Sequence, residues 1–138
     1  MSAVLGTIQP PFMLPADAVE ITIDLPFPPS VNHIWRRTAR QVYRSAKYLK
    51  WMEAADMMVM ANRQYPRHKI IGRFEATILL NEKSGHGDLD NRIKVCLDWL
   101  QSRDIIAEDK HCRRLIAEWA QHERAPRGCQ ITLRSLHG

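Results

Sequence analysis

The region from Ile70 to Ser102 constrains the fold most, because its hydrophobic spacing changes from a strand period to a helix period. Apolar residues in 70–80 fall on one face and predict a strand. Segment 82–87 contains glycine and polar residues and predicts a loop. In 89–102 the apolar residues recur at i, i+3, i+4 and i+7, which predicts an amphipathic helix. The chain therefore turns from strand to helix near residue 88.

Three other segments follow strand or helix patterns. Residues 19–25 alternate between apolar and polar side chains and predict a half-buried strand that ends at the following prolines. Residues 45–62 carry apolar side chains at helical spacing and predict a helix. Its expected core-facing side chains are Tyr48, Trp51, Met52, Ala55, Met58 and Val59. Residues 129–136 alternate again and predict a last strand.

Segment 110–121 fits two structures. Cys112, Leu115 and Trp119 recur at helical spacing, so the local pattern favours a helix. The alternative is a strand that pairs with 129–136 across the loop 123–128. Periodicity alone leaves both possibilities open.

The composition predicts one globular domain with a polyanionic partner. At 138 residues the chain is long enough for a hydrophobic core. Its net charge of +5 makes nucleic acid the first candidate partner. No apolar stretch is long enough for a membrane span, so no membrane association is expected. Three widely spaced cysteines without a CxxC pair indicate buried free thiols in a reducing cytoplasm, not a zinc site or disulfides.

Residues 1–18 differ from the rest of the chain. They contain three prolines and lack the basic and apolar regions of a signal peptide. We predict a poorly ordered N-terminal extension, with the folded domain covering 19–138. An arm that packs on a partner subunit is the alternative.

Acidic residues gather at the start of the predicted helix 89–102. Asp88 is placed to cap this helix, and Asp90 lies in the first turn, where the helix dipole tolerates negative charge. Lys94 follows Asp90 by one turn and shares its face. The simplest interpretation is a capped helix with an i,i+4 salt bridge. The alternative is a metal site.

Asp109 strengthens the metal-site interpretation. It follows a short apolar piece, and a chain reversal there would bring it back toward Asp88 and Asp90. Three clustered carboxylates repel one another unless a cation neutralises them. Carboxylate ligands without a Cys/His cluster favour Mg²⁺ or Mn²⁺ over zinc.

A basic segment extends from residue 36 to residue 50 and contains no acidic residue. Its arginines are Arg36, Arg37, Arg40 and Arg44. Aromatic residues are interleaved among them, and such a combination attracts phosphates and can stack on exposed bases. A solvated basic face is the alternative.

Two motifs together resemble the RusA family of Holliday junction resolvases. The stretch Leu25–Asn32, L-P-F-P-P-S-V-N, is similar to the family's L-P-x-P-P-S-x-N signature. The stretch Asp88–Asn91, D-L-D-N, with Lys94 and then Asp109, is similar to its D-L-D-N…K…D arrangement. The similarity extends over roughly Glu20 to Leu136.

The resemblance implies a small α/β (α+β) domain that acts as a homodimer. Its mixed four-stranded sheet and two main helices would follow the order β-α-β-α-β-β, which makes 110–121 a strand, and we adopt that assignment. Asp88, Asp90 and Asp109 would hold catalytic Mg²⁺, with Mn²⁺ as a substitute, and Lys94 would be the catalytic lysine. The residues expected to contact DNA are Asn32, Arg36, Arg37, Arg40, Arg44, Lys83, His86 and Lys94.

The activity implied by the resemblance is Mg²⁺-dependent resolution of Holliday junctions by paired symmetric nicks. Branched DNA is the expected partner, and no small-molecule substrate is expected. The rivals are a nucleic-acid-binding protein without enzymatic activity and a nuclease of broader branched-DNA range. Family members often carry an arginine run before D-L-D-N. Here Ser84–Gly87 occupies that place, so only Lys83 and His86 offer basic side chains.

Overall fold

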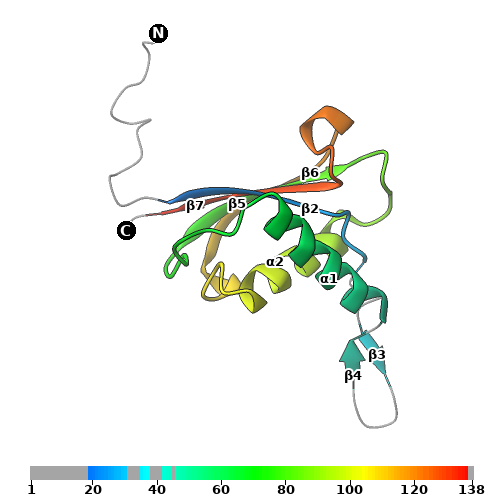
Figure 1. Ribbon diagram of the computed structural model, residues 1–138, viewed down its shortest axis with the longest axis horizontal. Coiled ribbons are helices and arrows are strands. Elements are labelled where there is room, and N and C mark those ends of the chain that lie inside the picture. Colours follow the sequence, from blue (N-terminus) through cyan, green and yellow to red (C-terminus); the bar gives the residue numbers. More distant parts are fainter. Residues whose placement is uncertain (1–18, 31–34, 38–41, 45, 137–138) are drawn as a thin grey trace.

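The structure is a computed structural model that describes residues 19–30, 35–37, 42–44 and 46–136. The predicted extension 1–18 lies outside these residues. In chain order the elements are β2 (Glu20–Leu25), β3 (Trp35–Arg37), β4 (Val42–Arg44), α1 (Ala46–Ala61), β5 (Phe74–Asn81), α2 (Leu89–Ser102), the 3-10 turn η3 (Asp109–His111), β6 (Cys112–Ala120), the 3-10 turn η4 (His122–Arg124) and β7 (Cys129–Ser135). Figure 1 shows α1 and α2 on the same side of the main sheet.

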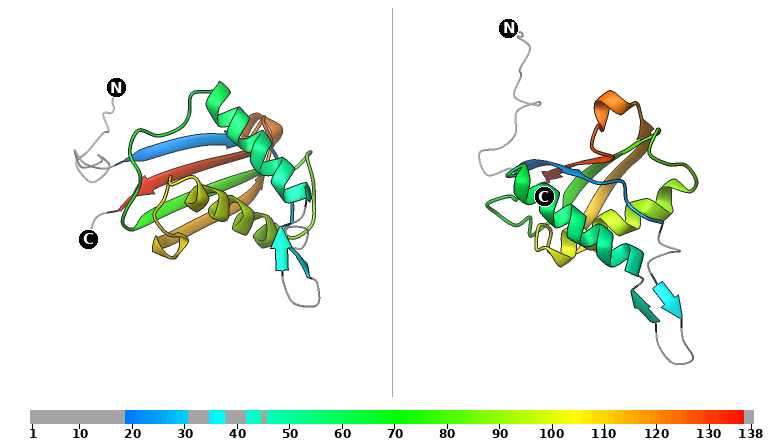
Figure 2. Two further views of the ribbon diagram at one scale, coloured as in Figure 1. Left: turned by 60° about the horizontal axis from the view of Figure 1, so that its bottom comes forward. Right: turned by 45° about the vertical axis from the view of Figure 1, so that its right-hand side comes forward.

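The main sheet is mixed, as predicted. Within the described residues its four strands lie in the order β2-β7-β5-β6. β7 is antiparallel to both of its neighbours, with Ile131 opposite Ile23 on one side and Ile78 on the other. β5 and β6 are parallel, and α2 connects them across the face of the sheet (Figure 2). The predicted order β-α-β-α-β-β is confirmed for these elements, and the hairpin of β3 and β4 is an addition that sequence reasoning missed.

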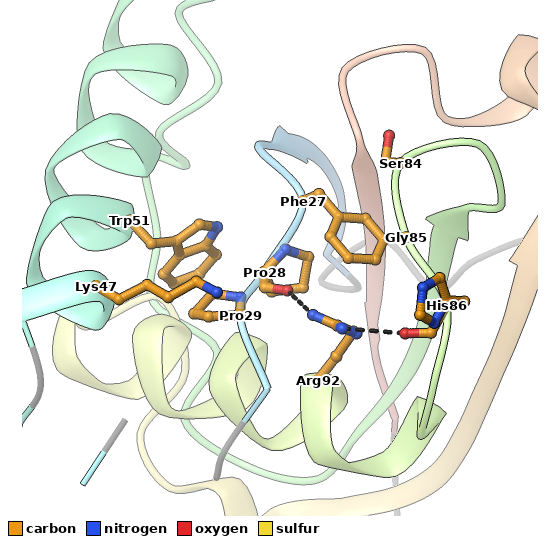
Figure 3. Close-up of a pocket in the computed structure, with 9 residues that line it drawn as sticks. All are labelled: Phe27, Pro28, Pro29, Lys47, Trp51, Ser84, Gly85, His86 and Arg92. Atoms are coloured by element: carbon orange, nitrogen blue, oxygen red, sulfur yellow. Dashed lines mark hydrogen bonds between the residues drawn. The ribbon is translucent and has the colours of Figure 1, made fainter. Parts of the chain in front are cut away.

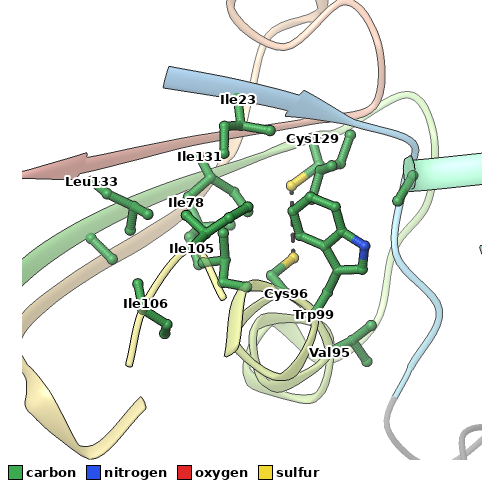
Figure 4. Close-up of a cluster of buried hydrophobic side chains, with 14 of the residues drawn as sticks. Ile23, Ile78, Val95, Cys96, Trp99, Ile105, Ile106, Cys129, Ile131 and Leu133 are labelled. Carbon is green, nitrogen blue, oxygen red and sulfur yellow. Dashed lines mark hydrogen bonds between the residues drawn. The ribbon is translucent and has the colours of Figure 1, made fainter. Parts of the chain in front are cut away.

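One face of the sheet forms the core with both helices. The alternation predicted for the strand in 70–80 is confirmed within β5. The β5 side chains that face the core are fully buried: Phe74, Ala76, Ile78 and Leu80. Figure 4 shows Val95 and Trp99 of α2 in the same cluster as Ile131 of β7. From α1 the buried side chains are Tyr48, Trp51, Met52, Ala55 and Val59. Met58, which the spacing also assigned to the core, is only partly buried.

The three cysteines are free thiols. Cys96 and Cys129 are fully buried, with their sulfur atoms 3.8 Å apart (Figure 4). The contact with Cys96 and burial raise the pKa of Cys129 well above its usual value, which keeps it protonated and unreactive. Cys112 is only partly buried. Burial was therefore predicted correctly for two of the three thiols.

One charged network joins the two helices. Asp56 of α1 accepts hydrogen bonds from the indole Nε1 of Trp99 at 3.0 Å and from Nε and Nη2 of Arg103 at 2.7 and 2.8 Å. Burial alone would raise the pKa of Asp56, but the hydrogen bonds from Arg103 and Trp99 and the Arg103 charge outweigh it and lower this pKa. The network holds α1 against the C-terminal end of α2.

Segment 110–121 shows where local reasoning was wrong. Residues 112–120 form a strand and not the helix favoured by the spacing of Cys112, Leu115 and Trp119. The alternative pairing with 129–136 is also wrong, because β6 pairs with β5 and β7 lies between β5 and β2. β6 is an edge strand, and half of the Leu115 side chain is exposed, so its apolar residues do not follow a clean strand alternation.

The start of β5 also differs from the expected strand. β5 begins at Phe74, not near Ile70. Ile70 instead forms an isolated parallel bridge with Ile106, in which its backbone N–H donates to the Ile105 carbonyl at 2.9 Å. The bridge anchors the segment that follows α2. Among the described residues, neither helix has the length and hydrophobicity needed to cross a membrane.

Candidate active site and nucleic-acid interface

The α2 helix begins where the acidic motif predicts. Gly87 adopts a φ of +101°, which an L side chain rarely adopts, and so allows the chain to turn into the helix. Asp88 occupies the N-cap position with an extended backbone, but its side chain makes no capping hydrogen bond. Its Oδ2 accepts a hydrogen bond from Nδ2 of Asn91 at 3.1 Å. The predicted cap position is confirmed, while the carboxylate remains exposed at the end of the helix.

A groove of about 530 Å³ lies between the first turns of α2 and strand β6. Asp88, Asp90 and Lys94 contribute its charged side chains. Its apolar wall is made by Leu89, Ile93, Leu97, Leu115 and Ala117. Two acids and a lysine thus share one concave surface with an apolar wall, as expected for residues at the edge of a cleft.

Lys94 links this groove to Asp109. Its Nζ lies 4.0 Å from Oδ2 of Asp109 and 3.5 Å from Oδ1 of Asp98. The backbone N–H of Asp109 donates to Oε1 of Gln101 at 2.9 Å, which holds η3 against α2. The chain reversal after residue 106 therefore brings Asp109 to Lys94, whereas the sequence predicted that it would approach Asp88 and Asp90. Sequence reasoning missed Asp98, although its i,i+4 spacing from Lys94 is a visible signal.

The three predicted metal ligands do not form a metal-binding cluster in the structure. Among the described residues, no group of three or more His, Cys, Asp or Glu side chains is placed to hold a metal ion. Asp88 and Asp90 line the groove. Asp109 lies next to Lys94, which also lines the groove. The donor chemistry fits a hard divalent cation, because all three side chains offer carboxylate oxygens. The assignment of Asp88, Asp90 and Asp109 as ligands stays a prediction.

Apart from Lys94, which lines the groove, the predicted DNA-binding residues fall into three groups. Lys83 and His86 are exposed in the loop between β5 and α2. Arg36 and Arg37 belong to β3, and Arg44 belongs to β4. Asn32 and Arg40 lie outside the described residues. Figures 1 and 2 show the hairpin next to the N-terminal end of α1, on the side of the domain where α2 begins.

Arg92 connects the L-P-F-P-P-S-V-N motif to the loop that precedes the D-L-D-N motif. From α2, its Nη1 donates to the Pro28 carbonyl at 2.7 Å, and its Nη2 donates to the His86 carbonyl at 3.0 Å (Figure 3). Its guanidinium also lies 4.7 Å from the ring centroid of Phe27. Phe27 stacks in turn on Trp119 of β6, with ring centroids 5.9 Å apart. The proline motif is thereby held against the loop that leads to the acids, a role that sequence reasoning missed.

Gly128 lies close against the backbone of Phe27. Replacing Gly128 by Ala is expected to lower the free energy of unfolding by about 2 kcal/mol. Its φ is +122°, and an added Cβ would lie 2.5 Å from the backbone N of Phe27. The matched control is Gly72→Ala, since a Cβ there meets nothing within 4 Å. Urea unfolding of both variants checks the prediction. Equal free energies of unfolding for the two variants would contradict the prediction, because the protein would then accommodate the added Cβ at Gly128 without loss of stability.

A protein-family model matches most of the chain. The family model described as endodeoxyribonuclease RusA matches residues 26–134, which include the first motif from Pro26 onward, the whole second motif, the groove and Arg92. No curated protein matches the chain. The matched region covers most of the sequence, and the chain belongs to the RusA family of endodeoxyribonucleases, hydrolases that resolve Holliday junctions.

Proposed function

We propose that this endonuclease resolves four-way DNA junctions by Mg²⁺-dependent hydrolysis and that a homodimer makes the two nicks. The observation that carries the proposal is the position of Lys94, which lines the groove with Asp88 and Asp90 and lies 4.0 Å from Asp109. A four-way junction has two-fold symmetry, so a C₂ dimer would present one groove to each of two opposed strands. The free thiols support a reducing, cytoplasmic location.

The charged side chains in and beside the groove have three proposed roles. Asp88, Asp90 and Asp109 would hold the divalent cation. When bound, Mg²⁺ would supply Lewis-acid stabilisation of the phosphate charge and make water a better nucleophile. The Lys94 ammonium would stabilise the negative charge that develops on the phosphate. Asp98, 3.5 Å from this ammonium, would keep it at the rim of the groove.

A panel of labelled DNA substrates tests the proposal. Purified protein is incubated with a four-way junction, a fork, a flap and a linear duplex, each with Mg²⁺ and with EDTA. We expect paired nicks in opposed strands of the junction with Mg²⁺ and no cleavage with EDTA. Equal cutting of all branched substrates would favour the broader nuclease. Salt-sensitive binding without any cleavage would favour the non-enzymatic alternative.

The oligomeric state needs a separate measurement. Sedimentation of the free protein and of its complex with an uncut junction should show two protein chains per junction. A single chain in a complex that still produces paired nicks would contradict the proposed dimer.

A further inference from the structure

A second cavity lies on the opposite side of the first turns of α2 from the groove, and we call it the proline pocket. It has a volume of about 290 Å³. Its walls come from the proline motif, α1, the loop before α2 and α2 itself. The residues that line it are Phe27, Pro28, Pro29, Lys47, Trp51, Ser84, Gly85, His86 and Arg92. Figure 3 shows Lys47 extending from α1 and Arg92 rising from α2 toward the same pair of prolines.

The pocket carries positive charge without matching acids. Within the described part of the chain, neither Lys47 nor Arg92 forms an ion pair with an acidic side chain. The two hydrogen bonds of the Arg92 guanidinium to carbonyls leave its charge uncompensated, and its buried Nε has no hydrogen-bond partner among the described residues. A cavity with two uncompensated cations is suited to an anion such as a phosphate.

Part of the remaining wall is apolar. Trp51 is only 6% exposed, and its indole Nε1 donates to the Pro26 carbonyl at 3.0 Å, so its ring is held in place. Pro28 and Pro29 extend this wall. Flat apolar surfaces beside a cationic site are what a nucleotide needs, since the phosphate pairs with the cations and the base covers the apolar wall.

The pocket and the groove lie on opposite sides of the first turns of α2. At about 100° per residue, Arg92 points about 160° away from both Asp90 and Lys94. His86, which lines the pocket, lies two residues before Asp88, which lines the groove. A DNA strand that crosses the start of α2 would therefore place neighbouring nucleotides at the two sites.

We propose that the proline pocket binds one nucleotide of the DNA strand, next to the phosphate that is cut. Its phosphate contacts Lys47 and Arg92, and its base lies against Pro28, Pro29 and Trp51. This inference rests on the proposed function and adds a second contact between the strand and the enzyme. The occupant is a nucleotide that leaves the base stack, because duplex DNA keeps its bases inside.

NMR of the ¹⁵N-labelled full chain tests the pocket directly. The chain has four tryptophans, and Trp99, fully buried beside Asp56, serves as the internal reference for Trp51. Thymidine 5′-monophosphate, thymidine and inorganic phosphate are added separately, without Mg²⁺. We expect the nucleotide to shift the Trp51 indole N–H signal saturably and more than either part alone. No shift of Trp51, or a full shift with phosphate alone, would overturn the proposal.

A matched pair of variants tests the role of Lys47. Lys47→Gln and Lys50→Gln remove the same charge from neighbouring, exposed positions of α1, but only Lys47 lines the pocket. We expect Lys47→Gln to abolish the Trp51 response to the nucleotide and Lys50→Gln to keep it. We also expect Lys47→Gln to lower the salt dependence of junction binding by about one phosphate contact. Equal effects in both variants would show a general charge effect and overturn the proposal.

These measurements separate the pocket from the proposed function. Both are made without Mg²⁺, so they do not depend on cleavage. If the protein cuts no junction but the Trp51 response requires Lys47, the proposed function fails and the pocket stands as a nucleotide site. If junctions are cut in the proposed manner but Trp51 does not respond, only the pocket proposal fails.

Discussion

Replacing Asp90 by Asn is expected to remove Mg²⁺-dependent junction cleavage while junction binding is retained. Asn has nearly the same size but no negative charge, so it is a poor ligand for a hard cation. We expect a fall in cleavage rate of at least about 10²-fold, the size typical of losing one group that stabilises a transition-state charge. Asp90 is exposed in the first turn of α2, so the fold should tolerate the change.

The matched control for this variant is Asp104→Asn. Asp104 lies just after α2 with a φ of +59°, a conformation that Asn adopts readily. Its ion pair with Lys69 has side chains 80% and 42% exposed and contributes little to stability. Single-turnover cleavage and junction binding without Mg²⁺ are measured for both variants. Undiminished cutting by Asp90→Asn would remove Asp90 from the site.

Replacing Asp56 by Ala is expected to lower the free energy of unfolding by about 3 kcal/mol. The substitution leaves the indole N–H of the fully buried Trp99 without its acceptor and the Arg103 guanidinium without its carboxylate. The Asp56 and Arg103 side chains are 31% and 29% exposed, so water would recover part of the loss. Urea unfolding measures the effect. Glu53→Ala, at an exposed position of the same helix, should change stability by less than about 0.5 kcal/mol.

The stabilisation by Asp56 should depend on pH in a defined direction. Its pKa is lowered in the folded state, below its ordinary value of 3.8. Its contribution is therefore fully present above that value and is lost as pH falls through the lowered folded-state pKa. The stability difference between the wild type and Asp56→Asn should stay constant near neutral pH and shrink in acid. A difference that grows as pH falls would contradict the assigned network.

Local sequence patterns predicted most of the secondary structure. Helix 89–102 was predicted with the bounds that the structure shows, because a glycine turn, an N-cap acid and a helical apolar stripe all lie within a few residues. Strands β2 and β7 were each predicted to within one residue of the observed bounds, because their period-2 alternation reflects one buried face. The two acids and the lysine of the groove were also visible in the sequence, since Asp88, Asp90 and Lys94 lie within two helical turns.

Segment 112–120 shows the limit of local patterns. Its apolar spacing fits a helix, yet it forms a strand because β5 offers a parallel partner and α2 covers part of one face. The local pattern left helix and strand open, and only the resemblance to a family decided for the strand, without specifying its neighbour. Strand pairing depends on residues far apart in the sequence, and a local window contains no information about them.

The helix that follows the cap residue Asp88, the alternating strands and the acidic motif can be predicted from the sequence, because each depends on residues that lie close together in the chain. The position of β7 between β2 and β5, and the contact by which Arg92 joins the proline motif to the loop before α2, follow only from the folded arrangement. The same is true of the approach of Asp109 to Lys94. These contacts join segments separated by long stretches of chain, and they form only when burial of the common core brings those segments together.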